Sequence, residues 1–240
     1  MKKLSLILVC SASLFAASNS EISDFYSKSI KAQFPNATVS VSNRQKVGNT
    51  GFESVIVSVE LNGQKQENIL FTKDSLITPD LIDLKTGISY AQEYEMKKFQ
   101  EARENFTKNA KAVAQKETMV IALGDKNKPA IYVFSDPECP YCREHLAQID
   151  DELKNYQVNY ILTPVHGKSA FEKSALIYKE AKKAKNDKEK IAILNKYYDA
   201  NIKNYPKVSD AELKEVFSLY EKYRSLGLSA TPTILNKPNV

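Results

Sequence analysis

Two cysteines three residues apart, Cys139 and Cys142, are the side chains of this chain best suited to carry chemistry. They follow an apolar, β-rich stretch at 130–134 and precede a helical pattern. Pro140 falls at the first helical position, where a proline costs no hydrogen bond because the first amides of a helix have no intrahelical partner. Two thiols at a strand-to-helix junction predict a dithiol/disulfide redox site.

The position of each thiol relative to this helix predicts different roles. Free N–H groups and the positive end of the helix favour a thiolate on Cys139, which lies just ahead of them. Cys142 lies inside the first turn, where it is expected to be less exposed and suited to the role of resolving thiol. Glu138 works against the thiolate as a neighbouring negative charge.

A Cys-X-X-Cys pair is also half of a zinc site. Cys139, Cys142, His145 and His166 could in principle supply four ligands. The strand-to-helix context favours redox use over metal binding, so we predict no metal and surface roles for both histidines. Asp136, just ahead of the motif, is open to two interpretations, assistance in proton movement or formation of the turn that follows it.

The start of the sequence predicts export. Lys2 and Lys3 precede an apolar run from Leu4 to Ala17, which indicates a secretory signal peptide over residues 1–18. The run is shorter than the roughly 20 apolar residues that span a bilayer. Cys10 is expected to leave with this segment, and the remaining pair works in a compartment where disulfides persist. A Cys-X-X-Cys loop closes too few residues to stabilise a fold, which again favours redox chemistry.

The charge balance excludes a nucleic-acid-binding role. The chain has 240 residues and a net charge of +5. Without Lys2 and Lys3, 32 basic side chains stand against 29 acidic ones, a net charge of +3. Lysines are spread along helices in runs of mixed sign, so the run at 179–190 indicates a solvated helix face. The length predicts one or two domains.

Residues 19–87 are expected to form a small first domain. The pattern predicts a helix from Ile22 to about Gln33, followed by about four strands. Asn62-Gly63 lies between two alternating stretches and is a strong hairpin signal. The core of such a domain is small, and a sheet with exposed edges is stabilised by pairing with a second copy.

The polar segment at 88–116 predicts a linker helix of roughly 25 residues with a thin apolar stripe. The alternative is an ordinary surface helix packed on one domain. Residues 117–240 are then expected to form an α/β domain with a parallel pair of strands at its centre. Its strands are predicted at 119–123, 130–134, 158–162 and 229–235. Its helices are predicted from the cysteines to about Tyr156, and over 169–226 with breaks near Asn186 and Pro206.

The strand that ends in the motif 134–142, together with the late Thr231-Pro232, resembles a thioredoxin-fold oxidoreductase. The match is closer to the DsbC/DsbG group of exported disulfide isomerases, and 71–74 and 81–87 also look like the end of that group's dimerisation domain. The resemblance implies a thioredoxin-like redox domain with a helical insertion, preceded by a small α+β dimerisation domain and a linker helix.

Roles for individual residues follow from the resemblance. Cys139 is the implied nucleophile and Cys142 the resolving thiol. Pro232 alone would be assigned a trans peptide bond, but the family implies a cis proline facing the cysteines. The Thr231 backbone is then available to pair with a substrate segment, and Pro140 and Tyr141 are expected to contact substrate.

The sequence departs from the thioredoxin pattern at its end. Val240 follows only five residues after Leu235, which leaves no room for the usual final strand and helix. We therefore expect either a fragment or an open sheet edge.

The predicted function is that of a periplasmic thiol-disulfide oxidoreductase, a homodimeric isomerase or reductase of unfolded or misoxidised exported proteins. The resemblance implies recharging by a membrane electron donor of the DsbD type, and no organic cofactor. Two alternatives remain, a net thiol oxidase and a chaperone-like binding module with secondary redox activity. The Cys-Pro-Tyr-Cys motif also occurs in glutaredoxins, but these are small cytosolic proteins without a signal segment or an added domain.

Overall fold

The computed structural model describes residues 16–237, and the chain divides into two compact units between Lys98 and Phe99. This boundary lies within the long helix α2 (Tyr90–Ala114). The predicted limits at 19–87, 88–116 and 117–240 remain predictions. Within the described range, no helix is both long and apolar enough to cross a membrane.

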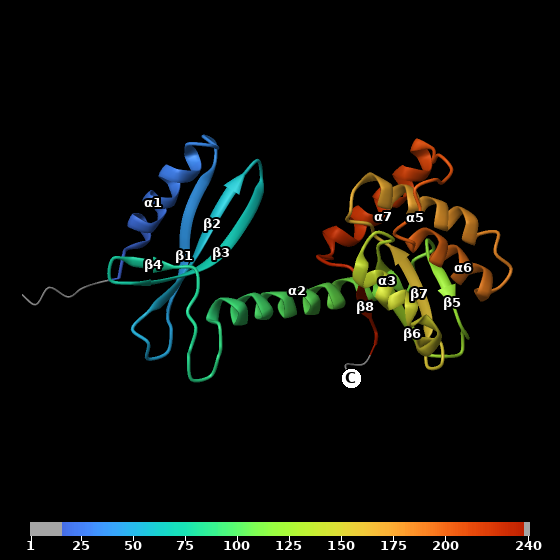
Figure 1. Ribbon diagram of the computed structural model, residues 1–240, viewed down its shortest axis with the longest axis horizontal. Helices are drawn as coiled ribbons and strands as arrows, with labels where there is room; N and C mark the ends of the chain where they lie inside the picture. Colours follow the sequence, from blue (N-terminus) through green and yellow to red (C-terminus); the bar gives the residue numbers. More distant parts are fainter. Residues whose placement is uncertain (1–15, 238–240) are drawn as a thin grey trace, which may run out of the picture. The chain divides into compact units, whose positions relative to one another are not determined.

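The first unit is a four-stranded antiparallel sheet with one helix against it (Figure 1). Its strands lie in the order β1-β2-β3-β4, and α1 packs against β1. The elements are α1 (Asn19–Lys31), β1 (Thr38–Lys46), β2 (Glu53–Leu61), β3 (Gln64–Lys73) and β4 (Leu76–Thr78). One helix and about four strands match the expectation from the sequence.

Local chemistry accounts for the two sharpest features of this unit. Asn62 and Gly63 both have positive φ, 53° and 77°, as a tight hairpin turn between β2 and β3 requires. The helix α1 begins three residues earlier than predicted because Ser18 and Glu21 form a capping box. The predicted signal segment falls mostly on residues 1–15, outside the described residues.

The core of the first unit is thin. Four buried side chains, Ile22, Val55, Val57 and Leu70, make up the cluster between α1 and the sheet. On the opposite face of the sheet, the buried Phe71 contacts Tyr90 edge to face at 6.5 Å.

The second unit is built on a mixed sheet in the order β5-β7-β6-β8. These strands are β5 (Ile121–Leu123), β6 (Ala130–Ser135), β7 (Gln157–Leu162) and β8 (Thr233–Leu235). The central pair β6 and β7 is parallel, as predicted, while β5 and β8 pair antiparallel to their neighbours. The strand predicted at 119–123 forms only over 121–123. The strand predicted at 229–235 forms only over 233–235.

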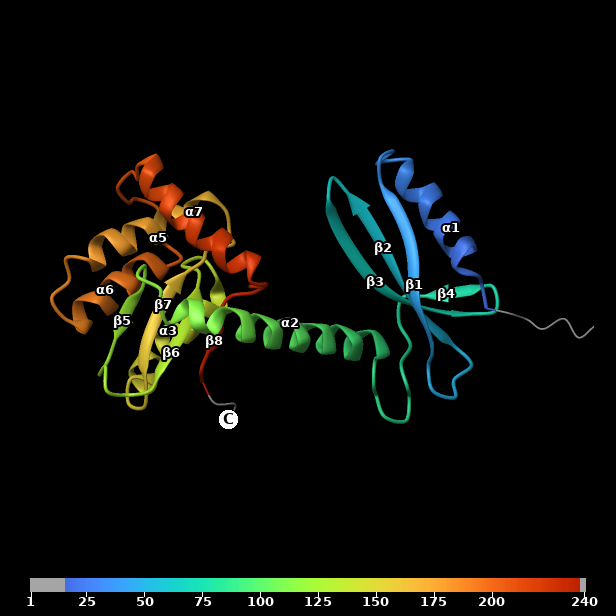
Figure 2. The ribbon, with the colours of Figure 1, turned by 180° about the vertical axis from the view of Figure 1, so that it is seen from behind.

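Five further helices complete this unit. They are α3 (Pro140–Ala147), α4 (Ile149–Glu152), α5 (Lys168–Ala181), α6 (Asp187–Tyr198) and α7 (Asp210–Ser225). The predicted continuous helix to about residue 156 is interrupted at Gln148, whose φ of −100° and ψ of 9° are not helical. Both views of the ribbon place α5, α6 and α7 together on one side of the sheet (Figures 1 and 2).

The last turns of α2 belong to the core of this second unit. Phe106, Ala110 and Ala114 are buried there. The Phe106 ring contacts Phe134 on β6 edge to face at 5.0 Å, and Phe134 contacts Tyr223 on α7 at 4.6 Å. Part of the helix expected as a linker is therefore a packed element of the domain that carries the cysteines.

Candidate active site

The two cysteines lie at the junction of β6 and α3. The strand ends at Ser135, and Cys139 is the N-cap residue of α3 with extended φ and ψ of −74° and 123°. Its backbone N–H donates to the carbonyl of Asp136 at 3.2 Å, which closes the connecting turn. Pro140 occupies the first helical position, so the local conformation is the one that the residue types favour.

Cys139 contacts Thr231, in the late Thr231-Pro232 segment that the family resemblance places opposite the cysteines. The Cys139 thiol donates to the carbonyl oxygen of Thr231 at 3.3 Å, across 92 residues of sequence. The Thr231-Pro232 peptide bond is cis, as the family resemblance implies. Both cysteines are free thiols, and Cys139 is 3% exposed.

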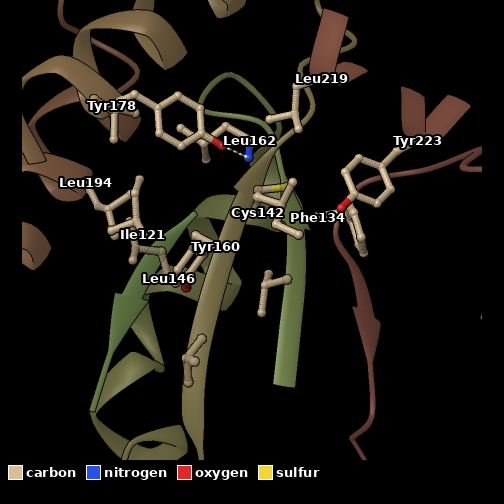
Figure 3. Close-up of a cluster of buried hydrophobic side chains, with 14 of the residues drawn as sticks. Ile121, Phe134, Cys142, Leu146, Tyr160, Leu162, Tyr178, Leu194, Leu219 and Tyr223 are labelled. Carbon is tan, nitrogen blue, oxygen red and sulfur yellow. Dashed lines mark hydrogen bonds between the residues drawn. The ribbon is translucent and has the colours of Figure 1, made fainter. Parts of the chain in front are cut away.

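Both cysteines belong to the buried cluster of the second unit, and Cys142 is the more buried of the two. It is 0% exposed, and Figure 3 shows its sulfur among apolar side chains that include Phe134 and Leu162. Its sulfur accepts the backbone N–H of Asp136 at 3.4 Å and a hydrogen bond from the Ser135 side chain. Burial raises the pKa of the Cys142 thiol well above that of a free cysteine, and these two hydrogen bonds, with a further one from the Thr231 side chain, offset this only in part. Cys142 is therefore a neutral thiol near neutral pH.

Sequence reasoning missed the support of this buried thiol. Tyr198, at the end of α6 and 2% exposed, donates its hydroxyl hydrogen to Ser135 Oγ at 2.6 Å. A chain of hydrogen bonds thus runs from Tyr198 through Ser135 to the Cys142 sulfur. Nothing in the sequence links a tyrosine of the helical insertion with the end of β6.

Asp136 anchors the loop ahead of the cysteines. Its carboxylate is fully buried; one oxygen accepts the N–H of Glu138 at 2.7 Å. The other accepts the N–H groups of Val165 and His166 at 2.6 and 3.1 Å, and His166 Nδ1–H at 2.8 Å. These bonds join the loop after β6 to the loop after β7. Of the two roles left open by the sequence, they match the structural one.

The two histidines have separate partners. His166 pairs with Asp136, whereas His145 Nδ1 lies 3.2 Å from the Tyr160 hydroxyl and its Nε2 lies 3.2 Å from Glu152 Oε1. Both were expected to have plain surface roles, and the His145 side chain is only 11% exposed. Within residues 16–237, no three His, Cys, Asp or Glu side chains are grouped as a metal site requires.

The remaining predicted substrate contacts lie at the surface next to Cys139. Tyr141 is 69% exposed and Pro140 is also exposed. Val165, which no sequence signal marked, is 48% exposed and lies on the loop that Asp136 holds. A second missed residue is Lys173 on α5, whose Nζ lies 3.0 Å from the carboxylate of Glu138.

Comparisons with known proteins bear on the family and the fold. A model of the thioredoxin-like domain family matches residues 115–237. The structure is similar to that of Helicobacter pylori DsbG, with a TM-score of 0.51 and 22% identity over 88% of this chain and 98% of that one. A second similar structure is that of the thiol-disulfide exchange protein α-DsbA2 from Wolbachia pipientis, with a TM-score of 0.40 and 13% identity. That match covers 57% of this chain and 84% of the other. A search of curated proteins found no match.

The family match and the similarity to DsbG confirm the predicted fold class. The second unit is thioredoxin-like and carries a helical insertion, α5 to α7, between β7 and β8. The similarity to DsbG extends over both units, so it includes the small α+β unit that precedes the thioredoxin-like unit.

Proposed function

The chain belongs to the thioredoxin-like domain family, and from this membership we propose that it is an exported thiol-disulfide oxidoreductase. We propose that it works in the periplasm, as an isomerase or reductase of disulfide bonds in unfolded or misoxidised exported proteins. Cys139 is the proposed nucleophile and Cys142 the resolving thiol. Thr231, Pro232, Pro140 and Tyr141 form the proposed surface for substrate.

The first step is thiol-disulfide exchange at Cys139. The Cys139 thiolate attacks one sulfur of a substrate disulfide, a new sulfur–sulfur bond forms between enzyme and substrate, and the other substrate sulfur leaves as a thiolate. The thiol proton of Cys139, which the Thr231 carbonyl accepts in the resting structure, must leave before the attack. The N-terminal end of α3 is suited to hold the resulting negative charge.

The mixed disulfide has two possible fates. In isomerisation, another substrate thiolate attacks the substrate sulfur and releases Cys139 as a thiolate, with no net transfer of electrons. In reduction, Cys142 loses its proton and attacks Cys139 Sγ, so the substrate leaves with two thiols and the enzyme with a disulfide. The second route needs two electrons from a donor before the next turnover, and we propose a membrane donor of the DsbD type.

The observation that carries the proposal is the unequal placement of the two thiols. Cys139 is 3% exposed, directly precedes the exposed Pro140 and Tyr141 and donates to the Thr231 carbonyl, whereas Cys142 is 0% exposed and has a raised pKa. Because the thiolate is the attacking form, a neutral Cys142 resolves the mixed disulfide slowly. A long-lived mixed disulfide gives substrate thiols time to attack, which favours isomerisation over reduction.

Exposed apolar surface on the first unit supports the proposal of a homodimer. Leu76 on the edge strand β4 is 68% exposed, and Leu84 in the following loop is 94% exposed. An edge strand with apolar side chains is a site where a second copy adds pairing and burial. The thin core of this unit is consistent with a need for such burial.

The test of the redox proposal is refolding of a protein with scrambled disulfides. The wild-type protein should restore its native disulfides, and Cys139→Ser should abolish this activity while leaving the fold intact by circular dichroism. Undiminished refolding with Cys139→Ser would show that the redox proposal is wrong and would favour a chaperone-like module. The reduction potential of the pair, together with its redox state in cells, separates a mostly reduced isomerase from a mostly oxidised oxidase.

The test of the dimer is sedimentation of the wild-type protein beside Leu76→Lys. We expect a wild-type dimer and a shift of the variant towards monomer, because a lysine opposes burial of the β4 edge. A monomeric wild-type protein contradicts the dimer and leaves the redox proposal untouched.

A further inference from the structure

Lys173 is a buried ammonium group in the helical insertion of the redox domain. The residue lies in the middle of α5 and is 5% exposed. A lysine is rarely buried to this extent unless a charged partner pairs with it. Its Nζ lies 3.0 Å from Glu138 Oε1. Within residues 16–237, the Glu138 carboxylate makes no other ion pair.

Glu138 directly precedes Cys139 in the sequence. Its side chain is 24% exposed, so water screens its charge only in part. A carboxylate in this position disfavours a thiolate on its neighbour. The ammonium of Lys173 opposes this repulsion, because a nearby positive charge compensates the carboxylate.

The surroundings hold Lys173 in this position. Its Nζ lies 6.0 Å from the centre of the Tyr205 ring, and the Tyr205 hydroxyl donates to Glu172 Oε2 at 3.2 Å. The segment between α6 and α7, to which Tyr205 belongs, therefore covers the lysine. The helical insertion thus places one buried cation, Lys173, beside Glu138, the residue that precedes the proposed nucleophile Cys139.

Arg143 and Asp136, which also lie near the motif, have partners of their own. Arg143 donates to the carbonyl oxygens of Glu138 and Pro137 at 3.1 and 3.5 Å, and so makes no ion pair with the Glu138 carboxylate. Asp136 is paired with His166. Changes at Lys173 or Glu138 therefore alter one charge pair and leave these groups in place.

We propose that Lys173 is a positioning residue that neutralises Glu138 and thereby sets the ease of ionisation of Cys139 and the reduction potential of the dithiol. The inference rests on the proposed redox function, because it assigns part of that chemistry to the helical insertion. Removing the lysine should disfavour the thiolate, and removing the carboxylate should favour it. The two partners of one ion pair are thus expected to act in opposite directions.

The experiment measures the rate at which iodoacetamide alkylates Cys139 as a function of pH, in the full chain. Lys173→Met should move the midpoint of this profile up by about one pH unit, and Glu138→Gln should move it down by roughly half a unit. The double variant should lie close to the wild type, since both charges are gone. Lys173→Arg, which keeps the charge, should restore most of the wild-type profile.

The equilibrium with glutathione gives a second readout. With the thiolate disfavoured, Lys173→Met should become more reducing, with a change of about tenfold in the equilibrium constant, or about 30 mV. Glu138→Gln should become more oxidising. A matched control is Lys179→Met, on the same helix, which removes a lysine paired with Glu212 at 2.8 Å and should move neither readout.

Unchanged midpoints in Lys173→Met and Glu138→Gln would overturn the inference, as would shifts of the same sign. If Lys173→Met does not fold, Glu138→Gln decides alone. Its side chain is 24% exposed and the amide oxygen can still accept a hydrogen bond from the Lys173 ammonium, and the midpoint of its alkylation profile must fall. Alkylation by a small reagent needs no protein substrate. A wild type that fails to refold scrambled proteins, yet shows these opposite shifts, would contradict the proposed function and leave this inference standing.

Discussion

The two thiols of the motif lie in contrasting surroundings although only two residues separate them. On the Cys139 side, polar and charged groups lie close to the thiol: the Thr231 carbonyl, the Asp136–His166 pair and the Glu138–Lys173 pair. On the Cys142 side, the sulfur is fully buried in the core and is contacted by a backbone N–H and by the side chains of Ser135 and Thr231. The difference is the basis for the proposal that Cys139 exchanges with substrate and Cys142 acts later.

The sharpest way to break this comparison is to remove Cys142, the proposed resolving thiol, alone. Cys142→Ser should leave Cys139 able to attack, but the mixed disulfide loses its intramolecular exit. We expect mixed disulfides with substrate proteins to persist at least about 100-fold longer than in the wild type, because an intramolecular thiol competes at a high effective concentration.

The measurement is non-reducing electrophoresis after acid quenching. Cys139→Ser is the control and should trap nothing. Equal trapping by both variants would show that the two thiols are interchangeable.

A test of the Cys139 side is Asp136→Asn. An amide has one acceptor oxygen, so some of the four N–H groups that the carboxylate accepts lose their partner. Buried unsatisfied donors cost about 1–3 kcal/mol each, and we expect a loss of about 3 kcal/mol in the free energy of unfolding.

Chemical denaturation checks this value. His166→Gln, which removes only the half-exposed partner, should cost less than about 1 kcal/mol. A similar loss in both variants would contradict the anchoring role of the buried carboxylate.

The pH dependence of resolution tests the Cys142 side. Burial is the first cause of the raised pKa of Cys142, and it persists when Cys139 is in a mixed disulfide. The thiol is neutral below that pKa, so the thiolate fraction and the rate of resolution should rise about tenfold per pH unit from pH 6 to pH 9.

Release of a chromophoric thiol from a mixed disulfide on Cys139 measures this rate, and Cys142→Ser should release none. A rate that is flat across this range would mean that Cys142 is already ionised, which contradicts its burial as a neutral thiol.

The smallest expected effect comes from Tyr198→Phe. This change removes the hydrogen bond to Ser135 Oγ, which should cost about 1 kcal/mol in the free energy of unfolding. It should also slow the attack of Cys142 a few-fold, because the Ser135 hydroxyl loses the donor that polarises it.

Tyr197→Phe is the matched control. The Tyr197 hydroxyl donates to Glu180 and not to Ser135. We therefore expect a similar loss in the free energy of unfolding, with no change in the rate at which Cys142 resolves the mixed disulfide. An equal effect of both variants on resolution would show that the Tyr198 contact has no part in it.

Features that depend on neighbouring residues could be predicted from the sequence. The strand, turn and helix around Cys139 follow from an apolar run, a proline and a helical pattern within about 20 residues. The Asn62-Gly63 hairpin has the same local origin. The helix break at Gln148 was missed, because the residues after it keep a helical pattern and no proline or glycine marks the interruption.

What the sequence determined by itself is the chemistry: two thiols, their order at the start of a helix, and an α/β unit to hold them. The tertiary structure decided the environment of each thiol. Lys173 and Tyr198 lie 31 and 56 residues after Cys142, and a lysine and a tyrosine on amphipathic helices carry no local sign of where they will be buried. Their placement depends on how the insertion packs on the sheet, because burial and charge pairing are properties of the folded chain.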